Sequence, residues 1–280
     1  MDFICPKCAA ELFPVANAKK CALGHSYDRA KAGYSNLLIG SGGGTHGDNR
    51  EMVRARTLFL SAGHYAPLAR RIADIVCELL PRGGVWLDAG CGEGYYTSLI
   101  SEALSHRFSG VCDQDAPTER LLAFDVSKDA VRAACKRCAG SFAVASSYSM
   151  PLCTESVDMV LNVFSPKAQS EVSRVLKDDG YFIFVYPDRH HLWELKSVLY
   201  DTPYENEPEV DMLEGFETVL VEEVRFTVSM HTPEEIGGLF LMTPYAYRTP
   251  KSGRERLEKL TELDTRVEFR IAVYRKKETL

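Results

Sequence analysis

Val85-Trp-Leu-Asp88-Ala-Gly-Cys-Gly-Glu-Gly94 is the stretch of sequence that decides the fold. Its first four residues are typical of a buried strand, and three glycines at alternate positions follow the strand directly. A helix is expected to begin at Tyr95. Because glycine lets a backbone approach a bound molecule where a side chain would clash, a glycine turn between a strand and a helix predicts a ligand site.

The spacing of this loop indicates which ligand it suits. A dinucleotide site has the pattern G-x-G-x-x-G, whereas glycines stand here at positions 90, 92 and 94. The carboxylate of Asp88 would repel a pyrophosphate but attract an ammonium group, and S-adenosylmethionine is a ligand with such a group. Asp125, at the tip of the next strand, can accept hydrogen bonds from ribose hydroxyls. The alternative is a glycine turn with a capping aspartate that binds no ligand.

Strands and helices alternate between residues 65 and 185 and predict the fold class. Helices are expected at 65–80, from 95 onward, at 127–138 and at 167–176. The Asp-Asp-Gly segment 178–180 is expected to end the last of these helices. Strands are expected at 85–88, 121–124, 142–145, 157–163 and 181–185. This order predicts an α/β protein with a doubly wound, Rossmann-like parallel sheet. Beyond Pro187 the expected elements are helices at 191–199, 233–241 and 254–263, an acidic loop at 200–215, and strands at 216–228 and 267–274.

The N-terminal cysteines have the spacing of a zinc site. Cys5 and Cys8 form a C-x2-C pair, and twelve residues later Cys21 and His25 form a C-x3-H pair. Zinc takes four nitrogen or sulfur ligands in a tetrahedron, and two such pairs on a short hairpin supply them. Four protein ligands leave no position for water, so we expect a structural zinc that supplies the folding energy of a small module.

Composition and charge set limits on function. The 280 residues are 45% hydrophobic and 26% charged, as in a globular protein. The absence of a long apolar run and of a secretory signal predicts a cytoplasmic protein with no membrane partner and reduced cysteines. The net charge is −6, but residues 1–60 carry 8 Lys and Arg against 5 Asp and Glu. A basic head on an acidic body is compatible with contact to phosphate, although ordinary surface variation gives the same difference.

Several motifs together resemble one family. Asp88-Ala-Gly-Cys-Gly-Glu-Gly-Tyr-Tyr-Thr97 is similar to motif I of class I S-adenosylmethionine-dependent methyltransferases, and the zinc module precedes it. Further matches are the segments 32–38, 62–65, 124–128 and 189–196 and the motif Met242-Thr-Pro-Tyr-Ala-Tyr-Arg248. The whole chain resembles the bacterial 23S rRNA (guanine-N1)-methyltransferases. The resemblance implies methylation of guanine N1 in a domain II hairpin of 23S rRNA, one structural Zn²⁺ per chain and a homodimer.

The resemblance also implies residue roles and a division of the chain. Tyr65, Tyr96, Thr97 and His191 would join Asp88, Gly90, Gly92, Gly94 and Asp125 in the cofactor site. We expect residues 1–37 to be a zinc-binding RNA-recognition module and 38–64, which include the glycine-rich 40–47, a linker and connecting helix. Residues 65–280 would form the methyltransferase domain, with an insertion at about 200–250. The segment Asn162-Val-Phe-Ser-Pro166 departs from the family pattern.

The sequence does not identify the group that would deprotonate guanine N1, a step that also requires the base to leave its pair. The candidates are His191, His64 and His46, whose imidazoles titrate near neutrality, and Asp158, whose position early in its strand favours a structural role. The candidates for stacking on the base are Phe164, Tyr245 and Tyr247, and those for holding phosphates are Arg29, Lys31, Arg50, Arg54 and Arg56.

Two other functions fit parts of the pattern. One is a small-molecule methyltransferase whose zinc module only covers the active site. The other is a non-enzymatic zinc-ribbon binding protein whose second domain senses the cofactor. The intact glycine loop and both acids, Asp88 and Asp125, weaken the second alternative.

Overall fold

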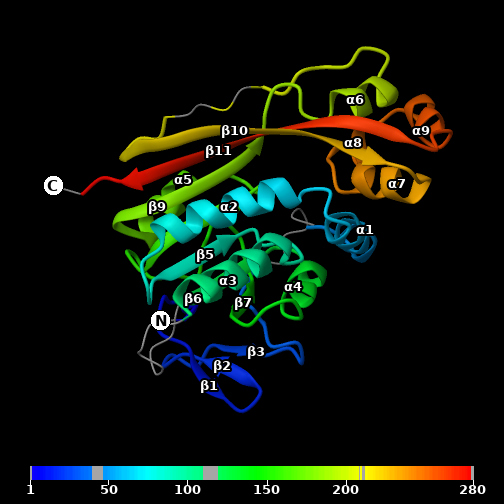
Figure 1. Cartoon of the computed structure of the whole chain (residues 1–280). Coiled ribbons are helices and arrows are strands. Elements are labelled where there is room, and N and C mark those ends of the chain that lie inside the picture. The colour runs from blue at the N-terminus through cyan, green and yellow to red at the C-terminus, as the bar shows by residue number, and fades with distance from the viewer. Residues whose placement is uncertain (1, 40–46, 110–118, 208, 210–211, 279–280) are drawn as a thin grey trace.

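The computed structural model describes residues 2–39, 47–109, 119–207, 209 and 212–278, and its centre is an eight-stranded sheet (Figure 1). The strand order is β10-β11-β9-β8-β5-β6-β7-β4. Strands from β9 to β4 run parallel, whereas β11 is antiparallel to both β9 and β10. The strands are β4 Ser35–Asn36, β5 Val85–Ala89, β6 Arg120–Asp125, β7 Ser141–Val144, β8 Val157–Val163, β9 Leu176–Pro187, β10 Phe216–Met230 and β11 Leu263–Lys276.

Both faces of the sheet are covered, because side chains along its strands alternate between the two faces. In β5, Trp86 packs with the core cluster that contains residues of α2 and α3, and Leu87 packs with the cluster that contains residues of α5. The helices are α1 Arg50–Ser61, α2 Ala66–Leu79, α3 Tyr95–Phe108, α4 Lys128–Ala134, α5 Gln169–Val175, α6 Trp193–Leu199, α7 Pro233–Leu241, α8 Tyr245–Arg248 and α9 Lys251–Leu257. This arrangement confirms the predicted doubly wound α/β class.

The N-terminal residues form a small antiparallel sheet of β1 Phe13–Val15, β2 Ala18–Lys20 and β3 Ser26–Asp28. Phe3 and Leu12 are buried in the same core cluster as β8 and α5. The amide of Ile4 donates to the carbonyl of Pro151 (2.8 Å), and β4 extends the edge of the large sheet beside β7. The N-terminal sheet is therefore fixed against the large sheet (Figure 1).

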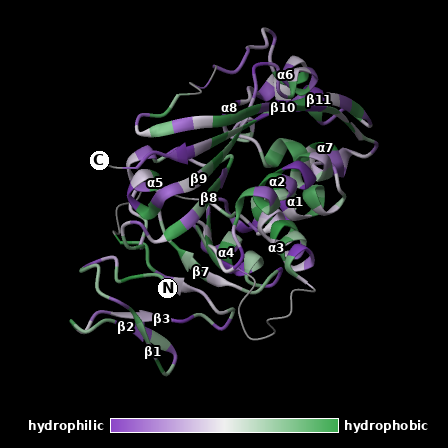
Figure 2. Cartoon of the chain, turned by 60° about the vertical axis from the view of Figure 1, so that its left-hand side comes forward, coloured by the Kyte–Doolittle hydropathy of each residue, from purple (hydrophilic) through white to green (hydrophobic). Residues whose placement is uncertain are grey.

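The long strands β10 and β11 close the opposite edge of the large sheet, and α7, α8 and α9 lie near one end of them (Figure 1). From Leu220 to Met230 on β10, buried or half-buried residues alternate with exposed ones, as expected for an edge strand with one face in solvent. Figure 2 shows hydrophobic and hydrophilic stretches along the ribbon of β10.

Three expected elements differ from the structure. The helix expected at 127–138 ends at Ala134, although Ser127 caps it as expected through a hydrogen bond from the Ala130 amide (3.1 Å). Residues 178–180 were expected to end a helix, but they belong to β9, which begins at Leu176. The pairing of β8 with β9 shifts register between Val157 and Met159, so the strand absorbs the Asp-Asp-Gly turn as an irregularity.

The last helix, α9, begins at Lys251 and ends at Leu257, earlier than the expected 254–263, because residues from Leu263 onward pair with β10. Most of the expected glycine-rich stretch 40–47, including His46, lies outside the described residues. Within the described part of the chain, no helix is long and apolar enough to span a membrane.

Candidate functional site

The four expected zinc ligands lie together in the N-terminal sheet. Their ligand atoms all lie within 4.8 Å of one another. The Sγ atoms of Cys5 and Cys21 are each 3.4 Å from His25 Nδ1, and the Sγ atoms of Cys8 and Cys21 are 3.6 Å apart. Tetrahedral zinc with Zn–S bonds of about 2.3 Å requires ligand separations of about 3.8 Å. The cluster therefore fits a closed, structural zinc site.

The hydroxyl of Tyr27 on β3 donates to Cys5 Sγ (3.1 Å). Such a contact stabilises a metal-bound thiolate and orients it. The expected turn at the second pair is also present, because Gly24 has a φ angle of 83° and its amide donates to the carbonyl of Cys21 (3.0 Å).

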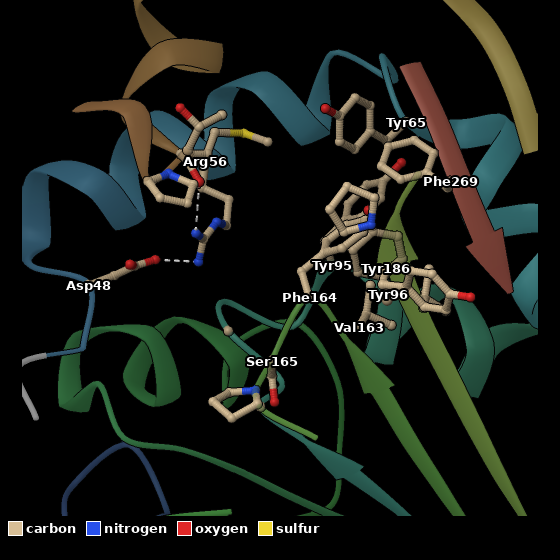
Figure 3. A pocket seen from close by; sticks show the side chains of 18 of the residues that line it. Asp48, Arg56, Tyr65, Tyr95, Tyr96, Val163, Phe164, Ser165, Tyr186 and Phe269 are labelled. Carbon is tan, nitrogen blue, oxygen red and sulfur yellow. Dashed lines mark hydrogen bonds and ion pairs between the residues drawn. The ribbon is translucent and has the colours of Figure 1, made fainter. Parts of the chain in front are cut away.

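A separate cavity of about 700 Å³ lies at the carboxyl ends of the parallel strands β5, β6, β8 and β9 (Figure 3). Its lining comes from parts of the segments 47–65, 88–96, 125–126, 163–166, 184–192, 204–209 and 242–248 and from Phe269. The strands β6 and β8 leave β5 on opposite sides, and ligands of doubly wound sheets bind at such a switch point. The volume suits a nucleoside-sized ligand with further space beside it.

The glycine loop forms the floor of this cavity. Gly90, Gly92 and Gly94 have φ angles of 96°, 54° and 83°, which residues with a Cβ rarely adopt. A Cβ on Gly90 would lie 2.4 Å from the Ser165 side chain. A Cβ on Gly94 would lie 2.9 Å from the Cα of Ala134. Glycine is thus required at position 90 so that the loop can lie against Ser165 at the cavity. It is required at position 94 so that α3 can pack against α4.

Asp88 is buried at the end of β5 and lines the cavity. Its Oδ2 accepts a hydrogen bond from the Thr97 hydroxyl (2.6 Å). Burial raises the pKa of Asp88 to about 7, although the Thr97 hydroxyl opposes this shift. A carboxylate that burial makes costly to ionise gains from a cationic ligand group beside it. Asp88 therefore fits the ammonium group expected from the sequence.

Asp125 ends β6 and also lines the cavity. Its Oδ2 accepts from the amide of Gly92 (3.0 Å), and its Oδ1 accepts from the amide of Ser127 (2.8 Å). Burial raises the pKa of its carboxyl, whereas these two amides lower it. The hydrogen bond from Gly92 shows that Asp125 holds the glycine loop. Each oxygen of its carboxylate can accept a further hydrogen bond, so Asp125 remains suited to ribose hydroxyls.

Aromatic side chains form one wall of the cavity (Figure 3). Tyr65 packs edge-on against Phe269, with ring centroids 5.1 Å apart. The hydroxyl of Tyr96 is buried with no hydrogen-bond partner among the described residues. Because an unpaired buried hydroxyl costs free energy, this atom fits a ligand that supplies a polar partner. Burial also raises the pKa of Tyr96 well above its usual range, so the hydroxyl stays protonated as a donor.

Thr97 and His191 occupy different places. Thr97 is fully buried behind Asp88 and is not among the lining residues, so it orients the carboxylate. His191 lines the cavity, and its Nδ1 accepts from the amide of Glu268 (3.2 Å). Burial lowers the pKa of His191 to about 3, and the charge of Lys196 lowers it further. The ring is neutral with its proton on Nε2, so it serves as a donor rather than as a base.

Asp158 lies at the amino end of β8, away from the cavity. Its Oδ2 accepts from the amide of Val85 (2.8 Å), and its Oδ1 pairs with the Nζ of Lys177 (2.7 Å). These contacts tie β5, β8 and β9 together at the edge opposite the glycine loop. The structure thus gives Asp158 the structural role, and it is no longer a candidate base.

The loop after β8 carries Phe164 at the cavity. Phe164 has a φ angle of 58°, a left-handed conformation that is rare for an aromatic residue, and it is 44% exposed. Asn162 fixes the loop, because its side chain donates to the carbonyl of Pro166 (3.0 Å) and accepts from the amide of Ser165 (3.1 Å). The hydroxyl of Ser165 donates to the carbonyl of Ala89 (2.8 Å). This segment therefore holds an exposed aromatic ring beside the glycine loop.

Some lining residues, such as Asp48, were not expected from the sequence, and Arg56 was expected only as a phosphate contact. Asp48 and Arg56 form an ion pair at the cavity, and Arg56 also reaches the carbonyl of Met242 (3.5 Å; Figure 3). Five of the seven residues of the motif 242–248 line the cavity. The motif itself was the signal that could have placed this segment at the site.

Comparisons with known proteins agree with this arrangement. Residues 3–39 match the family described as "RlmA, N-terminal", and residues 81–223 match the family described as "Methyltransferase domain". A Streptomyces fradiae protein named 23S rRNA (guanine(748)-N(1))-methyltransferase is 36% identical over 197 residues, which are 70% of this chain and 66% of the relative.

Two further relatives carry the name 23S rRNA (guanine-N(1)-)-methyltransferase as a provisional assignment. The Micromonospora griseorubida protein is 35% identical over 211 residues, which are 68% of this chain and 67% of the relative. The Bacillus subtilis protein YxjB is 29% identical over 287 aligned positions, 97% of this chain and 96% of the relative. The four-ligand zinc cluster and the cavity at the glycine loop agree with these matches. The chain belongs to the family of 23S rRNA (guanine-N1)-methyltransferases.

Proposed function

We propose that this protein transfers the methyl group of S-adenosylmethionine to N1 of a guanine in a hairpin of 23S rRNA. The observation that carries the proposal is the cavity itself. Gly90 and Asp88 suit a cationic nucleoside, and the half-exposed ring of Phe164 lines the same cavity. The names of the relatives support 23S rRNA and guanine N1 as the substrate and the atom.

The cofactor supplies a methyl carbon that is made electrophilic by the positive sulfur. The residues of the chain bind and orient both reactants and exclude water. We propose that Asp88 takes the ammonium group, Asp125 takes the ribose, and Tyr65, Tyr96 and His191 enclose the ligand. Guanine N1 loses its proton, its lone pair forms the bond to the methyl carbon, and the electrons of the broken C–S bond remain on sulfur.

Phe164 is proposed to stack on the unpaired guanine. Base stacking on an aromatic side chain contributes about 1–3 kcal/mol, so Phe164→Ala is expected to lower kcat/KM for RNA by about fivefold to 150-fold. Binding of S-adenosylhomocysteine should change less than about threefold, because Asp88 and Asp125, the residues proposed to hold its charged and ribose groups, are unchanged. The control is Tyr148→Ala, which removes an aromatic side chain that is 70% exposed and does not line the cavity. Equal losses in both variants would contradict the stacking role.

The raised pKa of Asp88 predicts a pH dependence of ligand binding. Between about pH 5.5 and about pH 7.5, Asp88 becomes charged as the pH passes its pKa of about 7, so S-adenosylhomocysteine should bind more tightly. The dissociation constant should fall by at most about tenfold per pH unit. Without ligand, the same raised pKa makes the protein less stable as the pH rises from about 4 to about 7.

Calorimetric titrations with S-adenosylhomocysteine over this range check that pH dependence. Asp88→Asn should bind weakly at every pH, with a flat profile. Adenosine, which lacks the ammonium group, provides the control and should show no such dependence in the wild type. A wild-type profile for S-adenosylhomocysteine that is as flat as that of Asp88→Asn would show that Asp88 does not meet the ammonium group.

We also propose that residues 1–37 form a module that recognises RNA and that residues 38–64 link this module to the methyltransferase domain. Residues 65–280 form that domain, with an insertion at about 200–250. The extent of the N-terminal family match, 3–39, supports the first boundary. Arg50 and Arg54 on α1, together with Arg29 and Lys31, are proposed to contact phosphates. A homodimer in the cytoplasm, where ribosomal RNA is made, completes the proposal.

Transfer of tritium from labelled S-adenosylmethionine tests the function. The acceptors are rRNA that lacks the modification and an extract of small metabolites. Label in the RNA supports the proposal. Label in metabolites alone identifies a small-molecule methyltransferase, and no label in either supports a cofactor-sensing binding protein.

A further inference from the structure

Lys196 on α6 is a fully buried lysine behind one wall of the cavity. Its Nζ donates to the carbonyl of Tyr204 (3.0 Å) and to the side-chain oxygen of Asn206 (2.7 Å). The same atom lies 4.9 Å from the ring centroid of Tyr204 and 5.6 Å from that of Tyr245. Because Tyr204, Asn206 and Tyr245 all line the cavity, this ammonium group directly contacts residues of the cavity wall.

The partners of this ammonium group are neutral. Within the described ranges, no carboxylate lies within 4.0 Å of the Lys196 Nζ. Burying a charge without an opposite charge costs free energy, which is reflected in the lowered pKa of Lys196, about 8, caused first by burial. A buried group kept at such a cost is more typical of a functional site than of a core.

Several charged and titratable residues lie on α6, next to it, or on the elements in contact with Lys196. They are His191 on the loop before α6, Glu194 on α6, Tyr200 directly after it, Glu205 beside Tyr204, Arg248 on α8, Arg256 on α9, and Arg266 and Glu268 on β11. Glu205 is exposed and binds Arg189 and His190, and Glu194 binds Arg266. The anions nearest to Lys196 are thus engaged elsewhere.

The carboxylates that line the cavity are also engaged. Their partners are Arg56 for Asp48, Thr97 for Asp88, Arg137 for Glu93, the amides of Gly92 and Ser127 for Asp125, and Lys167 for Glu209. None of these lining carboxylates is therefore free to act as the base that removes the N1 proton. A nearby positive charge that stabilises the deprotonated guanine is the alternative. Two other cations lie near the cavity. Arg56 is paired with Asp48, and Arg248 is exposed, so that solvent screens the charge of Arg248. The buried charge of Lys196 is not screened in this way.

We propose that Lys196 is a positioning residue for the acceptor guanine: its ammonium group fixes Asn206 in the cavity wall, and its buried charge stabilises guanine after the loss of the N1 proton. Asn206 in turn holds the segment before His191, since its side chain donates to the carbonyl of Asp188 (2.7 Å) and its amide to that of Arg189 (2.9 Å). The inference rests on the proposed function. The N1 proton passes to water, so no group of the chain has to retain it.

The experiment is a pH profile of the single-turnover rate of RNA methylation, with enzyme and S-adenosylmethionine saturating. This rate reports ionisations in the bound complex. Lys196→Gln keeps a hydrogen-bond donor and removes the charge, and Lys196→Arg keeps the charge. For Lys196→Gln we expect the midpoint of the rising limb to move up by about one pH unit, which lowers the rate near pH 7 about tenfold. Lys196→Arg should keep the wild-type midpoint.

Lys251→Gln, at a lysine whose side chain is 92% exposed, is the control for the substitution itself. Asn206→Ala keeps the charge and removes the clamp, so it should lower the rate by the same factor at every pH. If Lys196→Gln does not fold, Lys196→Met gives the same comparison. A uniform loss with an unmoved midpoint, or no loss, would overturn the electrostatic role of Lys196. A wild-type enzyme that methylates no RNA would instead refute the proposed function.

Discussion

Gly90→Val is expected to abolish binding of S-adenosylhomocysteine and to lower methyl transfer about a hundredfold or more. Two independent effects act at this position. The φ angle of 96° is strained for any residue with a Cβ, at a cost of about 1–3 kcal/mol. A Cβ would also lie 2.4 Å from the side chain of Ser165, so either Ser165 or the loop must move. A loss of about 2.7 kcal/mol in binding corresponds to the hundredfold effect.

The matched control is Gly237→Ala in α7, where a Cβ would meet nothing within 4 Å. This variant should keep wild-type binding and gain slightly in stability, since alanine favours a helix over glycine. Calorimetry with S-adenosylhomocysteine and circular dichroism should be run on both variants. A folded Gly90→Val protein that binds the ligand within threefold of wild type would show that the ligand does not approach this loop.

Cys21→Ser is expected to release the zinc and to abolish methylation of RNA while leaving most binding of S-adenosylhomocysteine intact. The N-terminal sheet has strands of only three residues, so the metal supplies most of its folding energy, about 10–16 kcal/mol in comparable peptides. Metal analysis should show about one zinc per wild-type chain and almost none in the variant. The cavity is built from other segments, so ligand binding should change less than about threefold.

The control for this prediction is Cys153→Ser, a change at a half-buried free cysteine outside the metal cluster. It should retain zinc and activity. A zinc-free Cys21→Ser protein that still methylates rRNA at the wild-type rate would show that this module has no part in RNA recognition.

Features set by short-range spacing could be predicted from the sequence. The C-x2-C and C-x3-H pairs reach one metal because each pair occupies a single turn, and the structure brings Cys5, Cys8, Cys21 and His25 together as expected. The strand, glycine loop and helix from Val85 to Phe108 also follow the local pattern. The Asp-Asp-Gly segment misled the prediction, since a polar turn that can end a helix can also be an irregularity in a long strand.

Features that depend on distant segments could not be predicted in this way. Arg56, Met242 and Phe269 are far apart in the sequence, and only the fold brings them to one cavity. Lys196 gave no signal either, because a lysine in a helical pattern is usually exposed. The structural role of Asp158 could be predicted, since a residue at the start of a parallel strand lies at the edge opposite the ligand site.

The most direct test of the central claim is mass spectrometry of nuclease fragments of 23S rRNA after reaction in vitro. Unmodified rRNA, S-adenosylmethionine and the purified protein should yield one hairpin fragment heavier by one methyl group, and its nucleosides should contain 1-methylguanosine. Asp88→Asn should yield far less of this fragment under the same conditions. A methyl group on another base or another atom, or rRNA that remains unmodified while the protein binds S-adenosylhomocysteine, would contradict the account.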